Sequence, residues 1–179
     1  MQFSDAVLPY LDDAYDLARW LTRDRNDAED VVQEAYSRAF KFFDGSKSTN
    51  PRAWILTIVR NSFYTWLKDK RAHEAEPLLE DAVGHPDSPY EPELWDPDQI
   101  SPETALSRKD DDNAVRMLIE ALPVQFREAL VLREFDELSY QEIAEITAVP
   151  IGTVMSRLAR ARRLLQTAWQ ERQKRECDV

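Results

Sequence analysis

The stretch that most limits how this chain can fold is residues 139–169, SYQEIAEITAVPIGTVMSRLARARRLLQTAW. Ser139 and Glu142 have the spacing of a capping box, in which each side chain bonds the backbone N–H of the other residue. Pro150 and Gly152 then interrupt the helical pattern, and Thr153 is predicted to cap a second helix. The order helix, tight turn and longer helix predicts a helix-turn-helix unit in an all-α chain.

The second of these helices has two chemically different faces, at about 100° of rotation per residue. Its apolar face comprises Val154, Leu158, Ala161 and Leu165. Its opposite face comprises Ser156, Arg160 and Arg163, flanked by Arg157 and Arg162. Such a basic helix can enter the major groove of DNA, where an arginine bonds a guanine edge or a phosphate. A solvated amphipathic helix with a cationic face remains the alternative.

The distribution of charge divides the chain into three parts. A net charge of −11 over 179 residues argues against a nucleic-acid partner, but residues 1–73 hold 11 acids and 11 bases, and residues 113–179 hold 10 of each. The whole imbalance lies in residues 74–112. Six of the ten prolines fall within 72–102. We therefore predict two small helical domains joined by an acidic, Pro-rich flexible linker, which we expect to mask the basic helices of the free protein.

The N-terminal block predicts three helices. The first is expected over 9–22, with an apolar stripe of Leu11, Tyr15, Ala18 and Leu21. The second is expected over 27–43, with Asp27 as its cap and a core-facing surface of Val31, Val32, Ala35, Tyr36, Ala39 and Phe40. The third is expected over 51–71, where Asn50 caps and Pro51 takes the first helical position.

The third helix mixes aromatic, basic and amide side chains: Trp54, Arg60, Asn61, Tyr64 and Lys68. Aromatic rings among cations can stack on unpaired nucleotides while the cations bind the backbone. That the aromatic residues are ordinary core residues remains the alternative.

Two further helices are predicted before the helix-turn-helix. One runs from 101 to 122, with the stripe Val115, Leu118, Ile119 and Leu122. Pro123 ends it, and a helix over 124–134 follows, with Phe126, Leu130 and Val131 buried.

Several classes of protein are excluded. The single cysteine, Cys177, leaves no disulfide framework and no Cys-rich metal site. A signal-peptide pattern and an apolar run near 18 residues are both absent, so a cytoplasmic protein without membrane insertion is expected. We find no phosphate loop, no metal-ligand spacing and no nucleophile–base pair, so we predict no enzyme, no cofactor and no metal. His73 and His85 are interpreted as surface residues.

Three segments in this order resemble the bacterial RNA polymerase sigma factors: DAEDVVQEAYSRAF (27–40), NPRAWILTIVRNSFYTWLKDKR (50–71) and LSYQEIAEITAVPIGTVMSRLARARRLL (138–165). With two domains and no further one, the chain resembles the compact extracytoplasmic-function (ECF) group of these factors. The resemblance implies a promoter-specificity subunit that binds core polymerase, recognises the −35 duplex and the −10 element, and helps melt the promoter to start transcription. It implies an N-terminal domain over 1–72, a linker over 73–101 and a C-terminal domain over 102–179.

The resemblance also implies roles for single residues. Core polymerase, through its largest-subunit clamp coiled coil, would be bound by Asp30, Gln33, Glu34 and Arg38. The −10 element would be opened and read by Lys47, Ser48, Asn50, Trp54, Arg60, Asn61 and Tyr64. The −35 element would be read by Thr153, Ser156, Arg157, Arg160 and Arg163. The polymerase flap and an anti-sigma factor are the other implied partners. Met155 departs from the family pattern, because many relatives carry a basic residue there.

Other interpretations of the same residues stay open. A helix-turn-helix repressor or activator would need a dimer interface, which the N-terminal block would have to supply. An adaptor or anti-sigma-like protein could share the acidic helix over 27–43 but would not need the arginine helix. A monomer that binds core polymerase would decide for the sigma interpretation.

Overall fold

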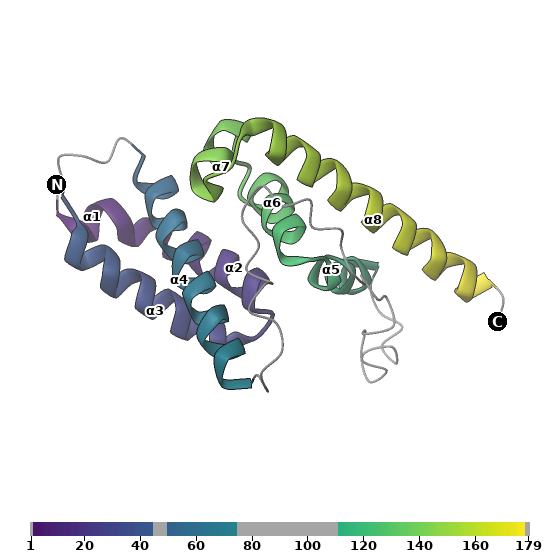
Figure 1. The fold of residues 1–179 in the computed structure, drawn as a ribbon, viewed down its shortest axis with the longest axis horizontal. Helices are drawn as coiled ribbons and strands as arrows, with labels where there is room; N and C mark the ends of the chain where they lie inside the picture. Colours follow the sequence, from purple (N-terminus) through teal and green to yellow (C-terminus); the bar gives the residue numbers. More distant parts are fainter. Residues whose placement is uncertain (1, 45–49, 75–110, 178–179) are drawn as a thin grey trace.

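The structure is a computed structural model that describes residues 2–44, 50–74 and 111–177. The regular structure in these three ranges is helical, with no strand among them, which confirms the predicted all-α fold. Figure 1 shows two groups of helices, one from each end of the chain, and the far end of α8 extends beyond the rest of the C-terminal group. Residues 75–101 of the predicted linker, the start of the helix expected at 101, and His85 lie outside the described residues, as does the side chain of His73.

The N-terminal group contains the three predicted helices and, before them, a short helix that was not predicted. They are α1 (Phe3–Val7), the 3₁₀ turn η1 (Leu8–Tyr10), α2 (Leu11–Thr22), α3 (Arg25–Phe42) and α4 (Pro51–Glu74). α2, α3 and α4 pack against one another in all three pairs. Their shared core includes the fully buried Leu17, Ile55, Leu56, Val59 and Phe63.

The prediction of one helix over 9–22 is wrong at its start. Pro9 lies in η1, and α2 begins only at Leu11. Leu11 was assigned to the core but is 42% exposed, whereas Leu17 is fully buried. The reason is that Leu11 is the first residue of α2, where its side chain lines an open surface groove beside α3.

The ends of α3 also differ from the prediction. Asp24 rather than Asp27 caps the helix, and its carboxylate accepts hydrogen bonds from the backbone N–H groups of Asn26 (2.8 Å) and Asp27 (3.0 Å). Its extended backbone directs the carboxylate to the free N–H groups, so the helix begins before Asp27 is reached. Phe40, assigned to the core, is 69% exposed because it lies near the far end of α3, where its ring meets only the edge of Phe3.

The C-terminal group consists of α5 (Asp111–Ala121), α6 (Val124–Glu134), α7 (Tyr140–Thr147) and α8 (Ile151–Cys177). The bounds of α6 equal the predicted 124–134, and its three predicted core residues are buried. In α5, Leu118 and Ile119 are buried as predicted, but Val115 is 41% exposed. Ile143, Val154, Leu158 and Ala161 are buried between α7 and its neighbours as the helix-turn-helix prediction requires.

The start of α7 confirms the predicted capping box, and the start of α8 corrects one predicted cap. The Ser139 hydroxyl accepts from the Glu142 N–H at 3.2 Å, and the Glu142 carboxylate accepts from the Ser139 N–H at 2.9 Å. α8 begins at Ile151, so Thr153 lies inside its first turn and is not the cap. The Thr153 N–H donates to the carbonyl oxygen of Pro150 at 2.9 Å, which means that the backbone before Thr153 is already helical.

The capping box gives the first testable prediction. Ser139→Ala removes the acceptor for the Glu142 N–H and should lower the free energy of unfolding by about 1 kcal/mol. Urea unfolding followed by circular dichroism measures this loss. Gln141→Ala, at an exposed position in the first turn of the same helix, should change stability by less than about 0.5 kcal/mol. An equal loss in both variants would contradict a stabilising role for the box.

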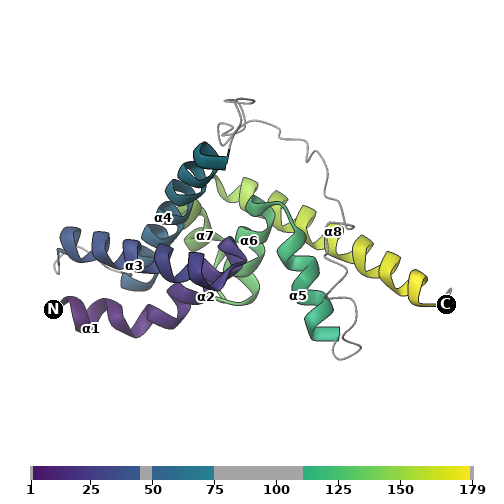
Figure 2. The ribbon, with the colours of Figure 1, turned by 90° about the horizontal axis from the view of Figure 1, so that it is seen from below.

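The two helical groups are in direct contact. α2 packs on α6 and α4 packs on α7. Figure 2 shows α4 crossing beside α6, α7 and the start of α8. At one edge of this interface the rings of Trp20 and Phe135 lie 4.9 Å apart between centroids. No pattern in the sequence predicts this interface.

Candidate nucleic-acid interface

The basic face of α8 lies where the sequence predicts it. Ser156, Arg160 and Arg163 are exposed, and Val154, Leu158 and Ala161 on the other side are buried. The Ser156 hydroxyl donates to the carbonyl oxygen of Thr153 at 2.9 Å. Arg162, on the flank, pairs with Glu134 of α6 at 2.7 Å. The helix therefore presents Ser156, Arg160 and Arg163 to a partner, while α6 and α7 support its back.

Arg157 differs from the other predicted −35 residues. It is partly buried, and its charge opposes the rise that burial causes in the pKa of both Tyr64 in α4 and Glu128 in α6. Arg157 therefore lies on the side of α8 that faces the N-terminal group, not on the free basic face.

The predicted −10 residues of α4 converge on one carboxylate of the other domain. Arg60 Nε donates to Glu128 Oε1 at 2.7 Å, and the Tyr64 hydroxyl donates to Glu128 Oε2 at 3.4 Å. The Arg60 guanidinium also lies over the Tyr64 ring, 4.6 Å from its centroid. Burial raises the pKa of Glu128, and Arg60 opposes that rise. Burial likewise raises the pKa of Tyr64, so its hydroxyl stays protonated and can donate.

The remaining predicted −10 residues lie along α4 and before it. Asn61 is exposed beside Arg60, and Trp54 is half buried with its ring 6.0 Å from that of Phe43. The side-chain oxygen of Asn50 caps α4 by accepting from the Ala53 N–H at 3.1 Å, which confirms that predicted cap. Lys47 and Ser48 lie outside the described residues, so the structure does not place them.

The predicted polymerase-binding residues share the outer side of α3. Asp30, Gln33 and Glu34 are exposed, and Arg38 is half exposed and pairs with Glu34 at 2.6 Å. Asp30, Glu34 and Arg38 line a groove of about 430 Å³ between α3 and α4.

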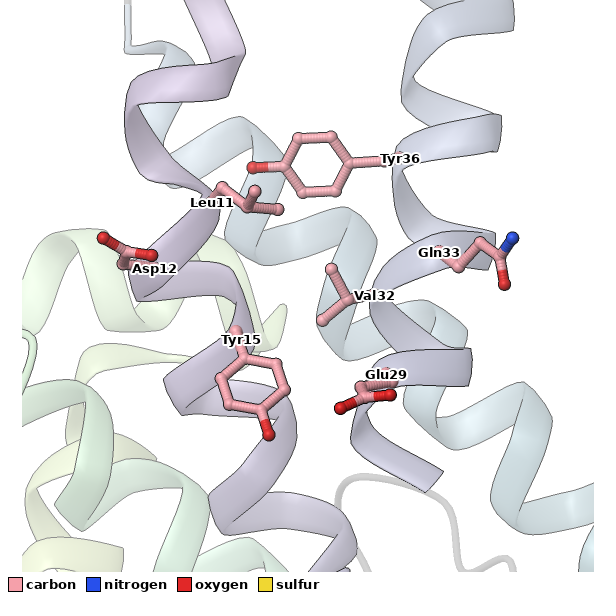
Figure 3. Close-up of a pocket in the computed structure, with 7 residues that line it drawn as sticks. All are labelled: Leu11, Asp12, Tyr15, Glu29, Val32, Gln33 and Tyr36. Atoms are coloured by element: carbon pink, nitrogen blue, oxygen red, sulfur yellow. The ribbon is translucent and has the colours of Figure 1, made fainter. Parts of the chain in front are cut away.

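Gln33 lines a second groove, of about 510 Å³, on the other side of α3. Figure 3 shows that groove between α2 and α3, with Leu11, Val32 and the rings of Tyr15 and Tyr36 along it and Asp12, Glu29 and Gln33 at its edges. The exposed side chains of Asp30, Gln33 and Glu34 therefore form an acidic ridge on α3, with a groove on each side of the helix.

Sequence reasoning missed three buried charged residues of the domain interface. They are Glu128 and Arg127 of α6 and Asp136 in the turn after it. Arg127 donates to the carbonyl oxygens of Glu120, Leu122 and, across the interface, Leu21. In the sequence, Glu128 lies between the core residues Phe126 and Leu130, but its side chain projects from the side of α6 opposite to theirs. A single sequence carries no signal that such a position faces a second domain.

Neither a metal site nor a membrane helix was found among the described residues. Within those residues, no group of three or more His, Cys, Asp or Glu side chains could hold a metal ion. None of the described helices is long and apolar enough to cross a bilayer.

Solved structures support the same two-domain architecture. A chain in the co-crystal structure of the sigma factor RpoE with the anti-sigma factor NepR, from Bartonella quintana, is 25% identical and superposes with a TM-score of 0.66, covering 94% of this chain and 96% of that one. The structure of CnrH with the cytosolic domain of CnrY shares the fold with a TM-score of 0.60 at 21% identity, covering 94% of this chain and 88% of that one.

Sequence comparisons identify the family. Residues 6–73 match the model described as sigma-70 region 2, and residues 112–165 match that described as sigma-70, region 4. The RNA polymerase sigma-H factor of Pseudomonas aeruginosa is 32% identical over 94% of this chain and 86% of that protein. The ECF RNA polymerase sigma-E factor of Haemophilus influenzae is 33% identical over 84% of this chain and 79% of that protein. The chain therefore belongs to the ECF group of RNA polymerase sigma factors and is a promoter-specificity subunit of bacterial RNA polymerase.

Proposed function

We propose that the two domains divide promoter recognition between them. The N-terminal domain (1–72) binds core polymerase and reads the −10 element, the linker (73–101) spans the polymerase, and the C-terminal domain (102–179) contacts the polymerase flap and reads the −35 element. The observation that carries this proposal is the exposed basic face of α8, backed by a buried apolar face and preceded by a capped α7.

In the C-terminal domain, Ser156, Arg160 and Arg163 read or hold the −35 duplex. A guanidinium can bond a guanine edge with two parallel hydrogen bonds or bind a phosphate. Arg157 also contacts the −35 duplex once the N-terminal domain no longer covers its side of α8. Thr153, in the first turn of α8, is close to the helix N-terminus, where a backbone N–H can bind a phosphate.

In the N-terminal domain, Arg60, Asn61 and Tyr64 lie along α4 with the spacing of one helical face, and Trp54, Asn50, Lys47 and Ser48 precede them. Unstacking a base costs a few kcal/mol, and stacking on an aromatic ring returns about 1–3 kcal/mol per base. The α4 side chains therefore supply both the stacking surface and the cation that an opened strand requires.

The acidic ridge of α3 is the surface that we assign to the polymerase clamp coiled coil. Glu34→Lys reverses a charge on this ridge and should weaken binding to core polymerase by about tenfold, because a charge matched to the partner becomes a repulsive one. Fluorescence anisotropy of the labelled chain titrated with core enzyme measures this effect. Glu145→Lys, an equal charge change on the exposed side of α7, should leave core affinity within about twofold. Equal losses in both variants would contradict the assignment.

The function itself is tested by transcription in vitro with purified core enzyme on a library of promoter sequences. The chain should direct initiation to a subset that shares −35 and −10 motifs at a fixed spacing. A chain that binds core enzyme but selects no promoters would contradict the proposal. We further propose a cytoplasmic location, a non-catalytic role, and an anti-sigma factor as a regulatory partner. Both structural relatives named above are complexes with a second protein, which in one case is an anti-sigma factor.

A further inference from the structure

Two exposed apolar side chains lie side by side at the start of α8. Met155 is 53% exposed and Ile151 is 41% exposed, whereas Val154 and Leu158 of the same helix are buried. Met155 follows Ile151 by four positions, so the two side chains are neighbours on the helix surface. A single exposed apolar residue is common on a protein surface, but this pair borders the residues that we assign to the −35 element.

Met155 adjoins the basic face of α8 at its N-terminal end. It directly precedes Ser156, and the exposed Ala159 lies one turn further along the same side. Arg160 and Arg163 follow on the exposed surface of the helix. In a helix-turn-helix unit, the N-terminal residues of the second helix are those that contact base edges. Met155 therefore has the position of a residue that reaches into the major groove.

Gly152 leaves open space beside this pair. A Cβ atom added at Gly152 would meet no atom within 4 Å, and its φ is not positive. Neither packing within the chain nor the backbone conformation therefore requires a glycine there. Gly152 precedes Met155 by three positions and Ser156 by four, so all three share one side of the helix. The missing side chain allows a partner to approach this side of α8 closely.

The chemistry of the pair limits what it can recognise in DNA. A thioether and an alkyl chain carry no N–H or O–H donor, so they cannot bind a phosphate or a guanine edge as an arginine does. The apolar group that a base pair presents in the major groove is the C5-methyl group of thymine. Arg160 and Arg163 supply the positive charge that brings DNA to this helix, which makes duplex DNA the partner that fits the apolar pair.

We propose that Met155, with Ile151 beside it, contacts the C5-methyl group of a thymine in the −35 element and thereby selects thymine at that position. This proposal rests on the proposed −35 role of α8. It deepens that role, because it names a base and the chemical group on it that an apolar side chain of this chain recognises.

The test removes single methyl groups from the DNA. The full chain is bound to core polymerase, and the probe is a fluorescein-labelled duplex with the −35 and −10 motifs that this holoenzyme selects in transcription. Each thymine of the −35 element, on either strand, is replaced in turn by deoxyuridine, which keeps the base pair and lacks only the methyl group. At one thymine or more the affinity, measured by fluorescence anisotropy, should fall about fourfold, the worth of one buried methyl group.

Variants of the chain show whether Met155 is the residue responsible. Met155→Ala should bind the thymine and deoxyuridine duplexes equally, at the lower affinity, because the contact is already lost. Met155→Leu should keep most of the difference, since leucine is also apolar and of similar size. The matched control is Val115→Ala, which shortens a side chain of α5 that is 41% exposed and should keep the full difference.

The salt dependence of binding separates a methyl contact from an ionic one. Met155→Ala should leave the slope of log affinity against log salt unchanged, because no phosphate contact is lost. Arg163→Ala should reduce that slope by about one if Arg163 binds a phosphate.

Two results overturn the proposal. One is a −35 element in which no thymine loses affinity on replacement by deoxyuridine. The other is a methyl effect of the same size in Met155→Ala. A holoenzyme that selects promoters through Arg160 and Arg163 but ignores the methyl groups would keep the proposed function and lose only the thymine contact. A holoenzyme that selects no promoter would lose both.

Discussion

Replacing Arg160 and Arg163 together by alanine is expected to lower −35-dependent transcription by about 100-fold, since each good arginine contact to a base is worth about 1–3 kcal/mol. Both side chains are exposed on the free face of α8, so their removal should leave the fold intact. Run-off transcription with core enzyme, on a promoter that the natural chain selects, measures the loss. Core affinity, measured separately, should not change, because α3 is untouched.

Arg162→Ala is the matched control for this loss. It removes an arginine from the same helix, but one that is paired with Glu134 at 2.7 Å and lies on the flank. Transcription by Arg162→Ala should stay within a few-fold of the natural level, given the small worth of an exposed ion pair. If the Arg160 and Arg163 variant transcribes as well as this control, α8 does not read the −35 element as proposed.

Lowering the pH from 8 to 5 is expected to favour the closed state, in which the two domains are packed together, over the open state, in which they are separated. The expected shift is up to about 100-fold. The responsible group is Asp136, which faces Arg52 of α4 and, at longer range, Asp13 and Asp16 of α2. Burial raises its pKa to about 7, with Arg52 acting against that rise and the two aspartates adding to it. A raised pKa in the closed state means that this state binds the proton more tightly. Its stability is therefore greatest below the open-state pKa near 4 and is lost as the pH rises through 7.

Energy transfer between donor and acceptor dyes measures this shift directly. The dyes are placed on the exposed Ser37 (α3) and Gln170 (α8) as cysteines, with Cys177→Ser. Transfer in the natural chain should rise as the pH falls from 8 to 5. Asp136→Asn removes the buried charge, so it should be more closed at pH 8 and should show a much flatter response. A response of the same size in Asp136→Asn would show that other groups, Glu128 first among them, govern the change.

Much of the fold within each domain could be predicted, because the responsible interactions are local. The bounds of α6, the capping box at Ser139 and the two faces of α8 depend on residues three or four positions apart, which the sequence displays directly. The cap of α3 was predicted wrongly at Asp27, because Asp24, one helical turn earlier, is chemically equal to it. Only backbone geometry distinguishes them.

The interface between the domains could not be predicted, because its residues are polar in the sequence and buried only by a distant segment. Glu128 has the position of a solvated residue in the helical pattern of α6. Leu17 and Leu11 are equally apolar, but Leu17 is fully buried and Leu11 is 42% exposed, because the packing of α2 against its neighbours covers one and not the other. The residues of the −10 and −35 surfaces were assigned by resemblance. The structure adds that Arg60, Tyr64 and Arg157 lie near one carboxylate.

The hydrogen bonds of Arg127 are divided unequally between the two domains. Its guanidinium is buried, burial lowers its pKa to about 10, and it stays charged at neutral pH. Two of its carbonyl partners, Glu120 and Leu122, belong to its own domain, and Leu21 belongs to the other. Separation of the domains would therefore remove one acceptor and leave the other two. The C-terminal domain thus keeps this buried cation hydrogen-bonded whether or not the N-terminal domain is packed against it.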